Sequence, residues 1–390
     1  MNILFLYKSQ ISECKGGVQK VTLALSNKLN ERGHNTYYLS QKRSEDRVIN
    51  NQEFFLEDND NPDGNELEYI FDFLKEKKIH VVVNQAAYGG GFSQLCKKIK
   101  KNIRVKIFSV IHNAPLGNVN NFFYSHPNVT KKLSKYKLGF LTKGTFVLFI
   151  LKQLYIAKYR KSYRTLYKNS DRVVLLSESF IPDFSKFIGR YIDNRVIVIS
   201  NPSTANIGLN SQICKKNEVL FVGRLDTTQK KVDFLLSIWS KFSEEFPNWK
   251  LNIVGDGQER GELEGLVTKG GLRNVHFHGF QEPTTFYQQA SILCLTSSYE
   301  GFGLVLVEAQ RYGTVPIAFN SFNSINDIIS NNENGVLIEP FNIEQYVDAL
   351  KKLAIDSELR EYMRYNAIES SKKFDLDSIC DIWVDEFNCK

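Results

Sequence analysis

Short apolar segments alternate with amphipathic segments along most of the chain. Residues 2–7, 105–111 and 291–295 form largely apolar runs, which are typical of strands buried on both faces of a parallel sheet. Residues 18–29 instead repeat apolar side chains every three or four positions, as one face of a helix requires. This alternation predicts the α/β class, in which helices cover parallel sheets.

Further elements follow the same alternation. Strands are expected at residues 36–39, 79–83, 171–176, 195–199, 218–222, 249–254, 275–280, 315–319 and 334–338. Helices are expected at residues 66–77, 232–246, 343–354, 357–373 and 376–387, with one more beginning at about residue 304. Residues 53–65 are acidic and contain an Asn-Pro-Asp-Gly turn, so we interpret them as solvated surface.

The length of 390 residues exceeds what one ordinary core supports and fits two domains. We place the first domain at residues 1–200 and the second at residues 218–372. Residues 201–217 are polar and rich in Asn and Ser, which favours a linker. Residues 373–390 form a terminal segment. Each half has the strand–helix alternation of a doubly wound, Rossmann-like domain.

Composition excludes several classes of protein. The hydrophobic share of 42% and the charged share of 24% are ordinary for a globular chain. The six cysteines are scattered without a Cys-x-x-Cys pair, which argues against a disulfide framework or a zinc site and fits a reducing compartment. No segment reaches the roughly 20 apolar residues that a membrane-spanning helix needs, and the short apolar start does not resemble a signal peptide. We therefore expect a cytoplasmic protein.

The net charge of +7 comes from one segment. Residues 130–170 contain eleven Lys or Arg and no Asp or Glu, so the rest of the chain is net acidic. The segment also holds the apolar run 146–151 and tyrosines that recur every fourth residue from Tyr155 to Tyr167, as on a helix. Three interpretations stay open: an interfacial helix pair on an anionic membrane, a helical hairpin packed on its own domain, and a nucleic-acid surface. We favour the membrane and expect no nucleic acid, because no nucleic-acid module accompanies the segment.

The strand expected at 291–295 leads into the stretch with the strongest chemical signal. A short polar loop is followed by Glu300-Gly301-Phe302-Gly303, and an apolar helix then begins at about Leu304 with Glu308 one turn inside it. Helix N-terminal amides at the carboxyl end of a parallel strand can bind an anion, and glycines let the main chain approach a ligand. Carboxylates in these places suit hydrogen bonding to hydroxyl groups. The stretch therefore predicts a nucleotide-sugar site.

Two cations follow the strand expected at 218–222. Arg224 stands at its carboxyl end, and Lys230 stands at the start of the next helix. Cations near a helix N-terminus are unfavourable unless an anion lies between them, and Arg can bind a diphosphate through two parallel hydrogen bonds. Lys231 follows directly, so the sequence leaves open which lysine reaches the phosphate, and we favour Lys230.

The first half offers two further candidates. The sequence Lys15-Gly16-Gly17 enters the helix at 18–29, where its amides could accept a phosphate or a sugar. His112 follows the strand at 105–111, and a neutral imidazole there can hydrogen-bond a sugar hydroxyl. The residues alone equally allow an ordinary turn and a structural histidine.

These motifs together resemble a known family. The Glu-x7-Glu spacing of Glu300 and Glu308, with the glycines between them and Gly-Thr-Val-Pro at 313–316, resembles the signature of family 4 retaining glycosyltransferases. Gly-Arg-Leu at 223–225, with Lys230 six residues after the arginine, is similar to that family's diphosphate-binding pair. Lys231 stands where the family commonly has Gly.

The resemblance spans nearly the whole chain and implies the GT-B fold, with two Rossmann-like domains and a cleft between them. It implies that the first domain binds the acceptor, that the second binds the nucleotide sugar, and that the helix at 376–387 crosses back to the first domain. In the first domain, the resemblance implies that Gly16 and Gly17 lie near the donor diphosphate and that His112 lies beside the donor sugar. In the second domain, it implies that Arg224 and Lys230 bind the diphosphate, that Phe280 lies beside the nucleobase and that Glu308 binds the ribose. The donor sugar would be held by Glu300 and by the amides of Gly301, Phe302, Gly303 and Leu304. We assign the catalytic roles to His112, Arg224, Lys230 and Glu300.

The expected reaction is retaining transfer of a hexose from a nucleoside diphosphate sugar, with UDP-sugars favoured, to a hydroxyl of a lipid-linked or cell-surface glycan at the inner face of the cell membrane. No metal or other cofactor is expected, because the cationic pair can stabilise the diphosphate. Asp58-Asn59-Asp60 has the spacing of a metal-binding Asp-x-Asp but lies in the acidic surface stretch. The alternatives are a non-catalytic nucleotide-sugar binder and a membrane-surface scaffold. A dehydrogenase would need a Gly-x-Gly-x-x-Gly after a strand, which neither half has in the proper place.

Overall fold

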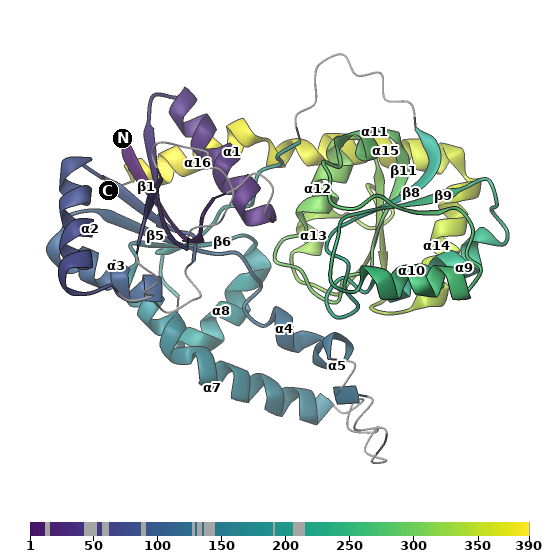
Figure 1. The fold of residues 1–390 in the computed structure, drawn as a ribbon, viewed down its shortest axis with the longest axis horizontal. Coiled ribbons are helices and arrows are strands. Elements are labelled where there is room, and N and C mark those ends of the chain that lie inside the picture. The colour runs from purple at the N-terminus through teal and green to yellow at the C-terminus, as the bar shows by residue number, and fades with distance from the viewer. Residues whose placement is uncertain are drawn as a thin grey trace. The chain divides into compact units, whose positions relative to one another are not determined.

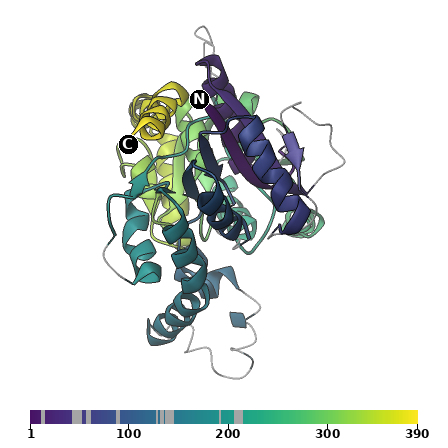
Figure 2. The same cartoon turned by 90° about the vertical axis from the view of Figure 1, so that its left-hand side faces the viewer.

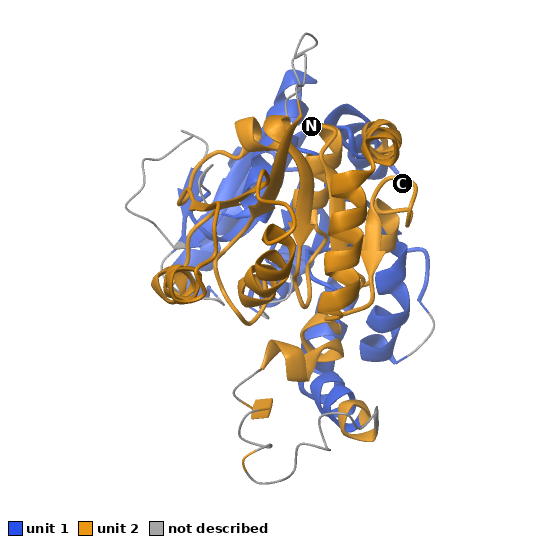
Figure 3. Cartoon of the chain, turned by 90° about the vertical axis from the view of Figure 1, so that its right-hand side faces the viewer, with its two compact units in different colours: residues 1–115, 150–204, 374–390 blue, residues 116–149, 205–373 orange. Residues whose placement is uncertain are grey.

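The structure is a computed structural model, and its contacts divide the chain into two compact units (Figure 3). It describes residues 1–11, 16–42, 53–56, 62–86, 91–126, 129–130, 135, 145–189, 192–205 and 215–389. The first unit contains residues 1–115, 150–204 and 374–390, and the second contains residues 116–149 and 205–373. Residues 116–149, which we placed in the first domain, thus cluster with the second unit, and most of the expected linker lies outside the described residues.

The first unit is built on a seven-stranded parallel sheet in the order β3-β2-β1-β4-β5-β6-β7 (Figure 1 and Figure 2). Its strands are β1 (Asn2–Ser9), β2 (Asn35–Lys42), β3 (Glu53–Phe55), β4 (Val81–Asn84), β5 (Lys106–Ile111), β6 (Arg172–Leu175) and β7 (Val196–Val198). Its helices are α1 (Gly17–Glu31), α2 (Gly64–Glu76), α3 (Gly91–Asn102), α7 (Thr145–Asn169), the 3₁₀ turn η3 (Glu178–Phe180), α8 (Ile181–Ile188) and α16 (Leu376–Asn388), although the first residues of α7 cluster with the second unit.

Strand β1 shows why helices cover both faces of this sheet. Its apolar residues point alternately to the two sides, as in any strand. Leu4 and Leu6 pack in a cluster that includes buried residues of α2 and α3. Phe5 points to the opposite face and stacks on Tyr38 with 5.9 Å between the ring centroids, and the Tyr38 hydroxyl hydrogen-bonds Ser26 of α1. A strand that is apolar on both faces therefore requires a helix layer on each side.

The last helix, α16, belongs to the first unit and packs beside α1. The rings of Trp383 and Phe387 pack on Phe108 of β5, with centroids 6.1 Å and 5.0 Å away. Arg32, which follows α1, pairs with Asp377 at 3.1 Å. The final residues of the chain thus complete the unit that its first strand begins.

The second unit is built on a six-stranded parallel sheet in the order β10-β9-β8-β11-β12-β13. Its strands are β8 (Lys216–Val222), β9 (Lys250–Val254), β10 (Val275–Phe277), β11 (Ala290–Leu295), β12 (Val315–Phe319) and β13 (Val336–Ile338). Its helices are α4 (Gly117–Asn120), α5 (Phe122–Ser125), α9 (Val232–Ser243), α10 (Arg260–Lys269), α11 (Thr284–Gln289), α12 (Leu304–Arg311), α13 (Ile325–Ile328), α14 (Ile343–Ile355) and α15 (Ser357–Ser371). The 3₁₀ turn η4 (Lys372–Phe374) follows α15, and its last residue belongs to the first unit.

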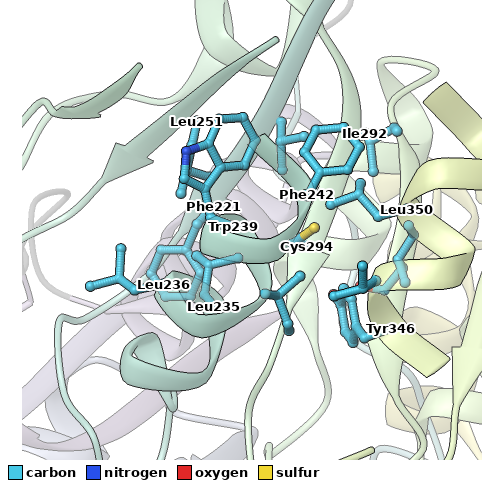
Figure 4. Packing of buried hydrophobic residues seen from close by; sticks show 14 of the residues in the cluster. Phe221, Leu235, Leu236, Trp239, Phe242, Leu251, Ile292, Cys294, Tyr346 and Leu350 are labelled. Atoms are coloured by element: carbon cyan, nitrogen blue, oxygen red, sulfur yellow. The ribbon is translucent and has the colours of Figure 1, made fainter. Parts of the chain in front are cut away.

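The core of the second unit forms where α9 and α14 pack on the sheet (Figure 4). Trp239 of α9 is fully buried and packs against Phe242, with 5.4 Å between the ring centroids. The one polar atom of its side chain is satisfied, because Trp239 Nε1 donates to the carbonyl oxygen of Arg273 at 2.9 Å. The predicted apolar face of residues 232–246 is therefore the face that anchors this unit.

The interpretation of residues 53–65 as solvated surface is wrong at its start. Glu53–Phe55 form the edge strand β3, and Glu53 Oε1 accepts hydrogen bonds from Ser40 Oγ at 2.7 Å and from the Ile11 amide at 3.0 Å. The Phe54 ring packs on Phe73 of α2 at 4.4 Å. A three-residue strand is too short to show a period of two, which is why the acidic composition hid it. Residues 57–61, and with them all of Asp58-Asn59-Asp60, lie outside the described residues.

Within the basic segment 130–170 the structure describes one long helix, α7, while residues 131–134 and 136–144 lie outside the described residues. The second half of α7 is packed: Tyr163 stacks on Phe187 of α8 at 4.2 Å, and Tyr163 and Tyr167 are buried. The first half instead exposes large apolar side chains, which are Phe146, Phe149, Ile150 and Leu154. Two of the four regularly spaced tyrosines are therefore core residues. In the described part of the chain, no helix has the length and apolar character needed to cross a membrane.

Candidate functional site

The predicted motifs of the second half lie at one point of the second sheet. The strand order places β8 between β9 and β11, so the chain connections leave β8 in opposite directions. Doubly wound folds bind ligands at such a switch point, outside the carboxyl ends of the strands. The loop 223–231 follows β8 and the loop 296–303 follows β11. Both motifs therefore stand at the place where this fold class holds its ligands.

The conformation of the loop 223–231 is organised by Asp226, which the sequence did not single out. Asp226 Oδ1 accepts hydrogen bonds from the amides of Thr228, Gln229 and Lys230 at 3.2, 2.6 and 2.9 Å, and Oδ2 accepts one from Arg224 Nε at 2.7 Å. Burial alone would raise the pKa of Asp226, but these amide and guanidinium hydrogen bonds hold it below its usual value. One carboxylate thus positions both predicted cations of the loop.

Lys230 and Glu300 form an ion pair that joins the two loops. Lys230 Nζ donates to Glu300 Oε1 at 2.6 Å, and Ser297 Oγ donates to the same oxygen at 2.6 Å. The side chains of Lys230 and Glu300 are only 14% and 10% exposed. Arg224 differs, because its side chain is 62% exposed and reaches Gln229 Oε1 through Nη2 at 2.9 Å. The structure therefore brings together one predicted cation and one predicted acid, with a second cation on the same loop.

Lys231 is oriented differently from Lys230. Lys231 directly precedes α9, and its backbone has the left-handed conformation, with φ of 53° and ψ of 48°. Glycine adopts this conformation without a steric clash, whereas other residues rarely adopt it. The Lys231 side chain is buried, its Nζ lies 5.4 Å from the centre of the Phe234 ring, and burial lowers its pKa. The ammonium group that faces Glu300 is that of Lys230.

The helix that carries Glu308 begins at Leu304 as expected. Gly303 precedes it with φ of 96°, a conformation that favours glycine. The Glu308 side chain is held by a residue that the sequence did not indicate, since the hydroxyl of the fully buried Tyr287 donates to Glu308 Oε2 at 2.9 Å. Burial, reinforced by the Glu308 charge, raises the pKa of Tyr287 well above its usual value, so Tyr287 remains a donor. Tyr287 therefore fixes the orientation of this carboxylate.

Removing the Tyr287 hydroxyl should weaken binding of a ligand that Glu308 contacts. We expect Tyr287→Phe to raise the dissociation constant or KM of that ligand about tenfold, because a hydrogen bond to a charged group contributes roughly 1.5–3 kcal/mol. Titration calorimetry on the purified variants measures this. The exposed Tyr362 supplies the matched control, Tyr362→Phe, which should bind as the wild type does. Equal affinities of the wild type and Tyr287→Phe would contradict the positioning role.

The first sheet has its own switch point, where β1 lies between β2 and β4. Gly16 caps α1 with φ of 68° and Gly17 is the first helical residue, while Lys15 lies outside the described residues. Gln85 follows β4 and its Oε1 lies 2.6 Å from His112 Nε2, which follows β5. His112 Nδ1 is buried, and no hydrogen-bond partner for it occurs among the described residues. With Gln85 Oε1 as the acceptor of the Nε2 proton, Nδ1 is left as an acceptor for an incoming hydroxyl.

Burial lowers the pKa of His112 from 6.5 to about 4. In the unfolded chain the same histidine has its ordinary pKa of 6.5. Between pH 4 and pH 6.5 the unfolded state therefore binds more protons than the folded state. The free energy of unfolding should therefore fall as the pH decreases from 6.5 towards 4, and His112→Gln should remove this contribution. Urea denaturation at several pH values in this window measures both slopes. Identical slopes for the wild type and His112→Gln would show that His112 does not have a lowered pKa.

Phe280 is the predicted site residue that stands apart. It follows β10, which is two strands away from β8 in the sheet, and 64% of its surface is exposed. Among the residues that the structure describes, no group of three or more His, Cys, Asp or Glu side chains could hold a metal ion.

Part of the chain is similar to known glycosyltransferases. Residues 210–370 match the family described as Glycosyl transferases group 1. An uncharacterized glycosyltransferase of Haemophilus influenzae is 30% identical over 215 residues, which cover 55% of this chain and 60% of that protein. The GalNAc-alpha-(1->4)-GalNAc-alpha-(1->3)-diNAcBac-PP-undecaprenol alpha-1,4-N-acetyl-D-galactosaminyltransferase of Campylobacter jejuni is 30% identical over 226 residues, which cover 57% of this chain and 61% of that protein. The chain thus spans about three fifths of the length of these relatives.

A solved structure extends the likeness to both units. The structure of S. aureus TarM in complex with fondaparinux, alpha-GlcNAc-glycerol and UDP has a TM-score of 0.74 and 14% identity, and the alignment covers 100% of both chains. At this identity the likeness shows the fold alone, and together with the two doubly wound parallel sheets it confirms the predicted GT-B fold. The chain therefore has the GT-B fold, and residues 210–370 match a family of glycosyl transferases.

Proposed function

We propose that the chain is a retaining, family 4 glycosyltransferase that moves a hexose from a nucleoside diphosphate sugar to a hydroxyl group of a lipid-linked or cell-surface glycan. The observation that carries this proposal is the Lys230–Glu300 ion pair at the switch point of the second sheet, with Arg224 on the same loop. An ammonium group beside a carboxylate at this place offers contacts for a phosphate and for a sugar hydroxyl at the same time.

In the reaction, the bond between the anomeric carbon and the phosphate oxygen breaks while the acceptor oxygen bonds to the same carbon. Negative charge grows on the departing diphosphate, and Lys230 and Arg224 stabilise it there. The departing phosphate takes the proton of the acceptor hydroxyl on the same face, which gives retention at the anomeric carbon. Glu300 and the main-chain amides of residues 302–304 hold the hexose, and Glu308 holds the ribose hydroxyls.

The donor base and the acceptor class are supported by the relatives. TarM was crystallised with UDP, and the Campylobacter jejuni relative is named for an undecaprenol-linked acceptor. We therefore assign a UDP-sugar as the donor and a lipid-linked glycan as the acceptor. A non-catalytic nucleotide-sugar binder would need the same contacts without turnover, so binding alone does not separate it from the enzyme.

We propose that helix α7 binds the cytoplasmic face of an anionic membrane. Its first half exposes four large apolar side chains, and its exposed cations include Lys158 and Lys161. Apolar side chains with flanking cations bind anionic lipid surfaces through burial and charge attraction together. Changing Lys158 and Lys161 to Glu is expected to lower binding to vesicles containing an anionic lipid. Equal binding of the variant and the wild type would remove the membrane from the proposal.

The decisive experiment joins a binding screen to product analysis. In a thermal-shift screen with UDP-, GDP-, ADP- and CMP-sugars, the UDP-sugars should raise the melting temperature most, because a ligand of the folded state stabilises it by mass action. The stabilising donor is then incubated with lipid-linked acceptors, and proton NMR of the product should show the anomeric configuration of the donor. Binding without turnover would favour the non-catalytic alternative, and an inverted product would contradict retention. Unchanged turnover after treatment with a chelator is expected, since the two cations take the place of a metal.

A further inference from the structure

Residues 116–126 contact the candidate site of the second unit, although they follow a strand of the first sheet in the sequence. Asn121, between α4 and α5, donates through Nδ2 to the carbonyl oxygens of Ser298 and Ser321, both at 2.7 Å. Ser125 Oγ donates to Ser298 Oγ at 3.1 Å. The segment thus makes three hydrogen bonds to residues that follow β11 and β12, and all of these residues belong to the second unit.

The two carbonyl groups that Asn121 contacts stand next to the Lys230–Glu300 pair in the hydrogen-bond network. The Ser298 amide donates to the carbonyl oxygen of Gln229 at 2.7 Å, directly before Lys230 in the sequence. Ser321 Oγ donates to the carbonyl oxygen of Ser297 at 2.6 Å, and Ser297 Oγ in turn binds Glu300. Asn121 therefore holds the main chain at the point where the loops 223–231 and 296–303 meet.

An asparagine suits this task because its primary amide carries two N–H donors on one nitrogen. One nitrogen can therefore donate to two carbonyl oxygens at once, as it does to those of Ser298 and Ser321. An aspartate of the same shape would place a negatively charged acceptor against the same two acceptors, and an alanine would leave both carbonyl groups without this donor.

We propose that Asn121 is a positioning residue of this site: its amide holds residues 297–300 in the conformation in which Glu300 pairs with Lys230. The role in holding the loop stands on the contacts alone, whereas the consequence for sugar transfer rests on the proposed function. Sequence comparison of the second half could not reveal this residue, because Asn121 lies 177 positions before its partner Ser298.

The test uses the full chain and two variants, each of which replaces an asparagine by an aspartate and so adds one negative charge. Asn121→Asp is compared with Asn118→Asp, because Asn118 is exposed and lies on the same segment. Hydrogen exchange of the ligand-free proteins should be about tenfold faster in Asn121→Asp for peptides that cover residues 297–303, with no change in Asn118→Asp. Asn121→Ala, which adds no charge, should show the same direction of change if the aspartate variant does not fold.

Kinetics provide the second readout. With the donor found by the thermal-shift screen, Asn121→Ala should lower kcat about tenfold and change KM less, since Glu300 and Lys230 are displaced from the reacting sugar while Glu308 keeps its contact with Tyr287. A wild-type protein without transferase activity would refute the proposed function, and the exchange experiment would still decide the role of Asn121. Unchanged exchange at residues 297–303 in both Asn121 variants would overturn this inference.

Discussion

Under the proposed function, replacement of Lys230 by methionine is expected to lower kcat for sugar transfer about a thousandfold, because removing one preorganised donor at a developing charge typically costs a factor of 10² to 10³. Methionine keeps most of the length and the apolar contacts of the side chain but has no charge. Lys230 Nζ lies 2.6 Å from Glu300 Oε1, so the substitution removes the ammonium group that the structure places at the switch point. The KM of the donor should rise less than kcat falls, since the charge on the diphosphate grows as the bond breaks. Steady-state kinetics with the identified UDP-sugar measure both constants.

A second lysine and a double substitution separate catalysis from stability. Lys269→Met, at the exposed end of α10, is the matched control and should leave kcat unchanged. Breaking a poorly exposed ion pair leaves its partner without a counter-charge, so Lys230→Met should also lower stability. The double variant Lys230→Met with Glu300→Gln removes both charges and should recover part of that stability without recovering the rate. Recovery of kcat in the double variant would show that the pair has only a structural role.

The sequence predicted the elements well where the strands are buried on both faces. Strand β12 has the bounds that were expected, and the loops after β8 and β11 start within one residue of the expected positions. Continuous apolar runs bounded by polar loops leave little choice of register or type, because a shifted strand would expose its apolar side chains. The same reasoning failed for β3, which has three residues and an acidic neighbourhood.

The sequence could not predict the residues that hold the site together. Asp226 was visible beside Arg224, but the hydrogen bonds of its carboxylate depend on the conformation of the folded loop. Tyr287 and Gln85 contact Glu308 and His112 across 21 and 27 positions of sequence. A polar side chain shows its type in a sequence but does not show its partner, and no periodicity connects residues on different elements. Such supporting residues therefore require coordinates.

The basic segment shows a similar limit. Spacing of four residues correctly indicated a helix for Tyr155 to Tyr167, but it did not separate a membrane face from a core face. The structure divides the helix, because Tyr163 packs on α8 while Phe146 and Phe149 are exposed. The amino-acid composition of the whole segment does not show which half of α7 is packed. The burial of the individual side chains shows this. The large exposed apolar side chains of α7 are therefore confined to its first half, Phe146 to Leu154.

Substitution of Gly255 by alanine should have the largest effect on stability among the glycine positions near the site. Gly255 follows β9 with φ of 140°, and a Cβ atom there would lie 1.9 Å from the carbonyl oxygen of Gly223, which follows β8. A main-chain oxygen cannot move aside by rotating as a flexible side chain could. The added Cβ atom would therefore force the ends of β8 and β9 apart. We expect a loss of about 3 kcal/mol in the free energy of unfolding, the upper end of the usual cost of overpacking. Urea denaturation at neutral pH measures it.

The same substitution should impair the site, because Arg224 follows Gly223 directly and moves with it. The amide of Leu225 donates to the carbonyl oxygen of Asp256 at 3.0 Å, so separation of the strand ends also strains this contact between the loops. We expect kcat/KM to fall about tenfold even at temperatures where the variant is fully folded, since a small displacement of a charged group weakens its contact with the transition state. Gly265→Ala is the matched control: Gly265 lies inside α10 with nothing within 4 Å of an added Cβ, and alanine there should stabilise the protein by about 0.5–1 kcal/mol. A Gly255→Ala variant as stable and as active as Gly265→Ala would mean that the strand ends are farther apart than the structure has them.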